Sequence, residues 1–378
     1  MAQWQVYLKA HLVNSAAPFL GEAFEKAQFG FYDMTLTGTR EMSPRWKRVL
    51  RTTDRALGEA LGQMYVARAF SPKARTRAQE LVANVRAALK ERIVRLDWMT
   101  EPTRQAALHK LDAFMVKIGY PDTWRDYTGL QVDRSGFLAN VARAHTFAFR
   151  RDLAKLGKPI DRTEWDMTPS TVNAYYNPQL NEIVFPAGIL QPPFFDAEAD
   201  DAVNYGAIGM VIGHEMTHGF DDEGCQYDAD GNLKDWWTEA DRKAYTSRTD
   251  LVVAQYDALE TLPGVHLNGK LTLGENIADL GGLKIAFAAL QKSLEGKPRP
   301  AAIDGFTPEQ RFFLGYAQSW HFQAREEAAR MRAVVDPHSP ARARVNAPLA
   351  NLPEFAEAFG CKEEGPMHRP ADQRPAIW

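Results

Sequence analysis

Apolar residues recur at helical spacing over roughly the first 150 residues, and this pattern predicts a run of amphipathic helices. The first lies at about 4–13, the second runs from Ser43-Pro44 to about 69, the third covers 72–96, and a fourth begins at 100–103. The helical pattern is lost between 155 and 169, where glycine and proline recur. We interpret that stretch as a connector.

A short β-hairpin is predicted after the connector. Residues 171–176 and 182–186 are rich in β-prone side chains, and Asn177-Pro178 between them is a turn signal. Pro186 and the Pro192-Pro193 pair then end the strand pattern. The sheet that this chain builds is therefore expected to be small.

The next apolar stretch, 205–216, is predicted to be a helix whose start is capped by Asp200 and Asp201. Its glycines recur at intervals of three and four residues. They form a narrow face on the helix, so another element can approach closely there.

The remainder of the chain again reads as mostly helical. A helix is predicted from Thr307, with capping-box spacing and proline at its first position, to about Val334. The acidic segment 227–232 is predicted to be a plain turn, because its glycine stands fourth rather than sixth and no glutamate closes a calcium loop. The proline-broken tail to Trp378 is expected to wrap the domain. The predicted fold is mainly α with a small β-sheet or hairpin.

Composition places the 378-residue chain among ordinary soluble globular proteins, with 45% apolar and 25% charged residues. Its net charge of −3 gives no basic footprint, so nucleic acid is not an expected partner. No apolar run is long enough for a membrane span, and the first residues lack the pattern of a signal peptide. The two cysteines, Cys225 and Cys361, form no CxxC pair, and the sequence leaves open whether they join in a disulfide.

The strongest chemical signal is His214-Glu215-Met216-Thr217-His218. On a helix, this spacing places the two imidazoles one turn apart on one face, where both can reach a single metal ion. Glu215 then projects beside the metal, at the place of a general base. A helix that carries two histidines by chance is the alternative, but two histidines and a glutamate on an apolar helix require a reason for their burial. Zinc provides one.

A catalytic zinc site needs a third protein ligand, and Glu275 is the best candidate. Glu275 and Asp279 are four residues apart and share a helical face. The alternative is an exposed acidic pair, but apolar residues surround these two. One carboxylate on the metal and the other accepting a histidine N–H would complete the site. Asp221 is a second candidate for that supporting contact, and Asp222 is interpreted as a cap or turn residue.

At this point the chain resembles the catalytic half of the neprilysin-type zinc metalloendopeptidases, including their bacterial oligopeptidase members. The resemblance covers most of the chain and is densest in six motifs that follow the family's order, before a terminal Ile377-Trp378: 172–176, 183–195, 211–222, 274–282, 336–340 and 354–361. It implies a thermolysin-like (gluzincin) catalytic domain, one Zn²⁺ per chain and peptide substrates. It also implies zinc-dependent cleavage of oligopeptides with a bulky apolar residue after the scissile bond.

The resemblance also implies roles for individual residues. The zinc ligands would be His214, His218 and Glu275, with Glu215 as general base. Asp279 and Asp221 would orient the ligand histidines, His338 would stabilise the oxyanion, and Arg344 would hold a substrate carbonyl. The resemblance further implies that Asn173 and Ala174 belong to a strand that pairs with substrate backbone. It also implies an apolar pocket for a substrate side chain, lined by Ile189, Phe194, Met210, Val211 and Trp320. Without the resemblance, the pocket residues would be assigned to the core.

Full-length members of that family are nearly twice as long, and their earlier half supplies most of a helical lid. We therefore expect residues 1–165 to complete the catalytic domain and to include a remnant of the lid, and residues 166–378 to form the zinc catalytic region. Surface that a lid half would cover is expected to favour self-association. The family often acts outside the cytoplasm, in the periplasm or after secretion, although this chain shows no signal.

Two alternatives to an active endopeptidase follow from the sequence. One is a truncated, non-catalytic remnant that binds zinc or peptides without turnover. The other is a metal-dependent hydrolase of a different bond, which is weaker because nothing in the chain suggests recognition of nucleotides or sugars.

Overall fold

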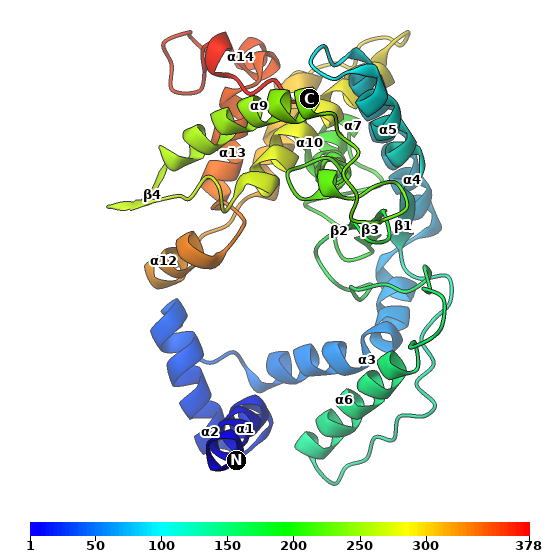
Figure 1. The fold of residues 1–378 in the computed structure, drawn as a ribbon, viewed down its shortest axis with the longest axis vertical. Coiled ribbons are helices and arrows are strands. Elements are labelled where there is room, and N and C mark those ends of the chain that lie inside the picture. The colour runs from blue at the N-terminus through cyan, green and yellow to red at the C-terminus, as the bar shows by residue number, and fades with distance from the viewer.

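The computed structural model describes all 378 residues, and most of them are helical. Figure 1 shows one group of helices, from the first 70 residues and from residues 137–153, at the end of the molecule opposite α9 and α14. We call this group the arm; it comprises α1 (Ala2–Ala16), α2 (Glu22–Gln28), α3 (Arg45–Ala69) and α6 (Phe137–Leu153), with a 3₁₀ turn at Ala17–Phe19 and a π-helical turn at Phe29–Thr35.

The remaining elements form what we call the body. Its helices are α4 (Pro72–Arg95), α5 (Glu101–Asp112), α7 (Asp201–Asn204), α8 (Met210–His218), α9 (Glu239–Asp257), α10 (Leu273–Leu294), α11 (Pro308–Ser319), α12 (Glu326–Val335), α13 (Ala341–Ala350) and α14 (Pro353–Phe359). Its strands are β1 (Met115–Gly119), β2 (Tyr175–Asn177), β3 (Glu182–Pro186), β4 (Glu260–Leu262) and β5 (Val265–His266). None of the helices is long and apolar enough to cross a membrane.

The predicted helices at the start of the chain are confirmed as α1, α3, α4 and α5. Two of their starts carry the expected signals: the Ser71 side chain accepts a hydrogen bond from the backbone N–H of Ala74, and Pro102 lies in the first turn of α5. The sequence analysis named no individual helix at α2 or α6, and it also missed the strand β1. Its five residues are too few to show a period that distinguishes a strand from a helix.

The predicted hairpin is present, although its first strand begins only at Tyr175. Strand β3 lies at the centre of a three-stranded sheet, antiparallel to β2 and parallel to β1. Strand β2 is therefore an edge strand. This small sheet lies beside α4 and α8 (Figure 1).

Two details of the predicted helices are wrong. Asp200 is the residue before α7, but its side chain makes no capping bond; both of its oxygens accept hydrogen bonds from Arg311, at 2.9 and 3.1 Å. The helix predicted from Thr307 to Val334 is two helices, because α11 ends at Ser319 and α12 begins at Glu326. The predicted capping box at Thr307 is present. At the break, the Arg344 guanidinium carbon lies 4.0 Å from the centre of the Trp320 ring. This is a tertiary contact, so no local sequence pattern could predict it.

The largest buried apolar cluster runs from Phe70 to Trp378 and lies wholly within the body. It surrounds α8 and α10, so the two helices that carry the predicted ligands cross at its centre. The C-terminal Trp378 is buried against Phe220, consistent with a tail that wraps the domain. Cys225 and Cys361 are both free thiols.

Candidate metal centre

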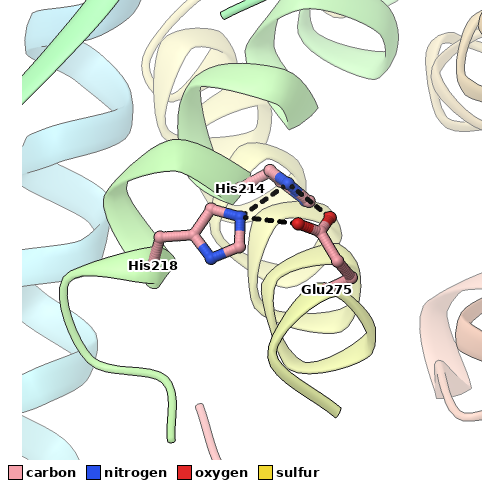
Figure 2. A group of neighbouring side chains, drawn as sticks. All are labelled: His214, His218 and Glu275. Atoms are coloured by element: carbon pink, nitrogen blue, oxygen red, sulfur yellow. Dashed lines mark hydrogen bonds and ion pairs between the residues drawn. The ribbon is translucent and has the colours of Figure 1, made fainter. Parts of the chain in front are cut away.

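The two histidines and Glu275 converge on one point, as Figure 2 shows. His214 and His218 project from α8, and Glu275 projects from the first turn of α10. The two histidine Nε2 atoms lie 3.0 Å apart. The Glu275 carboxylate oxygens lie 3.3 Å from His214 Nε2 and 3.5 Å from His218 Nε2. Three candidate ligand atoms therefore share one small volume.

Glycine allows the two helices to approach closely enough for this convergence. A Cβ atom added to Gly213 would lie 2.9 Å from the Cα of Gly282, and one added to Gly282 would lie 2.7 Å from the backbone nitrogen of His214. Backbone therefore packs on backbone where α8 crosses α10, beside the ligands. At Gly213, the narrow glycine face predicted from the sequence therefore packs against Gly282 of α10. Gly206, seven residues earlier, faces the backbone of Phe312 instead.

Each histidine is oriented by its own carboxylate. His214 Nδ1 lies 2.9 Å from Asp279 Oδ1, and His218 Nδ1 lies 2.6 Å from Asp221 Oδ2. A carboxylate on Nδ1 favours the tautomer that leaves Nε2 free for a metal. The two Nε2 atoms that face Glu275 are therefore the atoms left available as ligands.

Arg344 ties the carboxylates together. Its Nε donates to Asp279 Oδ2 at 2.7 Å, and its Nη2 donates to Asp279 Oδ1 at 2.6 Å, a two-bond fork on a buried carboxylate. Nη2 also lies 3.3 Å from Glu275. Nη1 has no protein partner and is the one guanidinium nitrogen left to bind another group.

The close packing of these charges shifts the pKa values of the site. Burial acts to lower the pKa of His214, but Asp279 and Glu275 outweigh it and raise the pKa to about 10. Burial acts to raise the pKa of Glu275, but the histidines and Arg344 hold it below its usual range. Glu275 and Asp279 are therefore ionised at neutral pH, and Glu275 presents a charged carboxylate to the point where the two Nε2 atoms meet.

Glu215 and His338 complete the inner surface of the site. Glu215 is buried and its carboxylate accepts no hydrogen bond from the protein; burial raises its pKa. His338 lies in the loop before α13, with Nδ1 2.9 Å from Asp336 and Nε2 3.2 Å from Glu275 Oε1. These two side chains therefore lie beside the three candidate ligands without duplicating them.

A cleft of about 480 Å³ opens onto this group. Of the site residues predicted from the sequence, only Asp279 does not line the cleft, because it lies behind His214. The others all line it: the three candidate ligands, Glu215, Asp221, His338, Arg344, Asn173, Ala174 and the five predicted pocket residues. Sequence reasoning did not single out several further lining residues, Met167, Val172, Tyr175, Tyr176, Pro178, Glu223 and Gly224. The two tyrosines belong to the predicted strand, and their place on it was the only available signal.

Comparison with known families agrees with this geometry. Residues 173–374 match the model of Peptidase family M13, and residues 1–121 match a second model with the same description, which represents an N-terminal region. The chain belongs to peptidase family M13. The neprilysin-type resemblance is thereby confirmed.

Relatives within family M13 match almost the whole chain. It is 40% identical to an endothelin-converting enzyme homolog of Locusta migratoria, covering 96% of this chain and 51% of that protein. It is 39% identical to human endothelin-converting enzyme 1, covering 96% and 48%. The crystal structure of the Mycobacterium tuberculosis zinc metalloprotease Zmp1 with an inhibitor superposes with a TM-score of 0.95 at 48% identity, covering 99% of this chain and 57% of that one. The thermolysin-like fold is therefore confirmed, and the chain spans about half the length of the relatives it matches.

The residues present fit the zinc that this M13 membership implies. Two imidazoles and one carboxylate are a donor set that zinc takes in hydrolytic sites, where it keeps one position open. Both imidazoles are already fixed by carboxylates, as zinc-binding histidines usually are. The donor atoms all lie within 4.8 Å of one another.

Proposed function

We propose that this chain forms the site of a zinc-dependent endopeptidase that hydrolyses oligopeptides. One observation carries the proposal: the three ligand atoms converge beside Glu215, whose buried carboxylate has no protein partner. A site built only to hold a metal would not need such a carboxylate. Unpaired buried charge is unfavourable, so a catalytic role accounts for its presence.

His214, His218 and Glu275 would hold one Zn²⁺ per chain, with Asp279 and Asp221 fixing the imidazoles. When bound, zinc supplies a Lewis acid that polarises the scissile carbonyl and promotes ionisation of water. The supporting contacts act before any substrate arrives, because they fix the direction of both Nε2 atoms.

Glu215 would act as general base and then as general acid. It takes a proton from the attacking water and passes it to the leaving amine. Burial raises the pKa of Glu215, which makes its carboxylate more basic than an exposed glutamate. The side chain lines the cleft, so both proton transfers take place at the same carboxylate.

His338 and Arg344 would bind the oxygen atoms of the substrate. Asp336 accepts from His338 Nδ1, which directs Nε2 toward the cleft as a donor for the oxyanion. The free Nη1 of Arg344 is available to a substrate carbonyl, while its other nitrogens remain on Asp279. Arg344 therefore links substrate binding to the carboxylate that orients His214.

The walls of the cleft suggest the class of substrate. Asn173 and Ala174 lead into the edge strand β2, where an extended peptide can add to the sheet. Ile189, Phe194 and Met210 line the cleft together with Val211 and Trp320, which suits a bulky apolar side chain. We propose that this side chain follows the scissile bond.

Mass-spectrometric mapping of cleavage in a mixed peptide set, with and without a zinc chelator, tests the proposal. We expect chelator-sensitive cuts before Phe, Leu or Ile. Cuts insensitive to chelation would contradict the zinc mechanism, and cuts without that preference would contradict the pocket assignment. Zinc bound at one per chain without any cleavage would favour the alternative of a chain that binds zinc or peptides without turnover.

A further inference from the structure

A buried lysine near the end of α5 lies beneath the loop that follows α8. Lys110 is 1% exposed, and its Nζ donates three hydrogen bonds, each 2.7 Å long, to the carbonyl oxygens of Gly219, Gly224 and Tyr227. All three donors of the ammonium are thereby used on backbone carbonyls of one loop. This arrangement fixes the path of the chain as it leaves the metal-binding helix.

The three carbonyls lie on either side of Asp221 in the sequence. Asp221 accepts hydrogen bonds from the backbone N–H groups of Glu223, at 3.0 Å, and Gly224, at 2.7 Å, on Oδ1, while Oδ2 lies 2.6 Å from His218 Nδ1. The loop that Lys110 holds is therefore the loop that aims the Asp221 carboxylate at His218.

The surroundings of Lys110 leave it no other role. Its Nζ lies 5.7–5.8 Å from the ring centres of Tyr176, Phe220 and Trp236, and no carboxylate lies within ion-pair distance. Burial lowers the pKa of Lys110 to about 8, with the nearby negative charge of Asp221 opposing that shift. An ammonium without an ion-pair partner is unfavourable in such a place, so its three carbonyl contacts must be its function.

We propose that Lys110 is a positioning residue for the metal ligand His218, acting through the loop and Asp221. The inference rests on the proposed zinc site. Removing the ammonium would leave the Gly219 carbonyl without a donor, while the Gly224 and Tyr227 carbonyls would keep one donor each, the Tyr227 N–H and the Trp236 Nε1–H. The loop would then be held less firmly on its α8 side. Asp221 would then hold His218 less firmly, and zinc would bind more weakly although every ligand is still present.

Lys117 provides a matched control. It is also buried, at 8% exposure, and its ammonium pairs with Glu182 at 2.7 Å and donates to the Glu164 carbonyl at 2.6 Å. It lies on β1, and neither of its two polar partners belongs to α8 or to the loop after it. Removing the Lys117 ammonium should destabilise the protein, because the buried Glu182 carboxylate loses its ion-pair partner. None of the candidate metal ligands is a partner of Lys117.

The experiment compares Lys110→Met with Lys117→Met in the full chain. Zinc affinity is measured by competition with a chromophoric chelator, and the geometry of the site by the visible spectrum of the cobalt(II)-substituted protein. We expect Lys110→Met to weaken zinc binding by about 10- to 100-fold and to shift the cobalt bands, because this is the usual effect of losing a contact that supports a ligand. Lys117→Met is expected to lower the unfolding midpoint with parental zinc affinity and spectrum.

A double-mutant cycle tests the route. Asp221→Asn is expected to weaken zinc binding, and adding Lys110→Met to it should weaken binding little further, because both changes remove the same restraint. Fully additive losses would overturn the route through Asp221. Parental zinc affinity in Lys110→Met, or equal losses in the two lysine variants, would overturn the inference.

A neutral amide keeps the test decisive if Lys110→Met does not fold. Lys110→Gln removes the charge and leaves a shorter side chain with two amide donors in place of three. Lys117→Gln is its control. Parental zinc affinity in Lys110→Gln would again overturn the inference. If the parental chain itself bound no zinc, the proposed function would fail, whereas normal zinc binding by the parent and the variant would reject only the role of Lys110.

Discussion

The arm and the body are both built from helices, but they differ in what those helices bury. Helices α1 and α2 bury no residue at all, and Trp4 and Leu12 of α1 are 67% and 71% exposed. In the body, Ile212 of α8 and Ile277 of α10 are fully buried. Apolar side chains therefore form an open surface in one region and a close-packed core in the other.

This difference shows what each region depends on. Local sequence is enough to form the helices of the arm, because few long-range contacts reach them. The body depends on contacts between distant residues, above all the crossing of α8 and α10 at Gly213 and Gly282. Chemistry lies in the body because only close packing can bring His214 and Glu275 together.

The largest difference between the regions is expected when the same Glu→Gln change is made in each. Glu275→Gln removes a ligand charge from the centre of the body and should weaken zinc binding by at least about 100-fold. Glu22→Gln in α2 removes only an exposed pair with Lys26 and should leave zinc affinity unchanged. Titration with a competing chelator measures both, and similar affinities in the two variants would contradict the ligand assignment.

A Gly→Ala change should have opposite signs in the two regions. At Gly282 the added methyl group meets backbone atoms of His214 and Met210 at 2.7 Å, so we expect a loss of about 2 kcal/mol in the free energy of unfolding. At Gly30 in the arm nothing lies within 4 Å of the new methyl, so we expect no loss and a gain of at most about 1 kcal/mol. Urea unfolding distinguishes them. A stable Gly282→Ala protein would show that the helices can separate without harm.

Buried charge near the site gives the body a pH dependence. Burial raises the pKa of Asp222 to about 6 from 3.8, so the folded protein binds a proton there more readily than the unfolded chain. The stability from this group is present at acid pH and is lost as pH rises through about 6. Asp222→Asn, which cannot ionise, should therefore gain roughly 1 kcal/mol over the parent between pH 4 and 7.

Asp228, in the same loop, should give stability the opposite dependence on pH. Burial acts to raise its pKa, but hydrogen bonds from Asn232 and Asp230 lower it overall. Asp228→Asn should therefore lose stability relative to the parent as pH rises above its acid titration. Unfolding curves from pH 2 to 8 test both variants, because the Asp228 difference develops below about pH 4 and the Asp222 difference mainly above it. Parallel pH profiles for the two would contradict this account.

The smallest effect on stability is expected from polar substitutions on the arm. Trp4→Gln with Leu12→Gln should change the free energy of unfolding by no more than about 0.5 kcal/mol, because both side chains are exposed. It should reduce self-association, because large exposed apolar patches drive association. Sedimentation measures this. Leu233→Gln is the control, because Leu233 lies in the body and is as exposed as Leu12, at 71%. Equal effects of the arm and control substitutions on self-association would show that the arm is not the associating surface.

The sequence was sufficient where spacing along one helix defines the chemistry. The four-residue interval places His214 and His218 together on α8, and the same interval places Glu275 and Asp279 on one face of α10. The hairpin was also predictable, because its turn residues are local signals. These features need no knowledge of distant contacts.

The sequence was insufficient where a role depends on tertiary contact. The break after Ser319 lies where Trp320 packs against Arg344, a contact from a distant helix, and β1 is too short to show a period. Lys110 looks like one more charge on a charged helix until the structure buries it beneath the loop after α8. The occupied fork of Arg344 is a further case, since its Asp279 partner lies on a different helix.

Zinc content and peptide cleavage, measured on the same preparations of the parent and Glu215→Gln, test the central claim most directly. The account predicts one zinc per chain in both proteins and a fall in turnover on the order of a thousandfold in the variant, because only the general base has changed. Unchanged turnover in Glu215→Gln with zinc bound would contradict the role of Glu215 and, with it, the proposed mechanism.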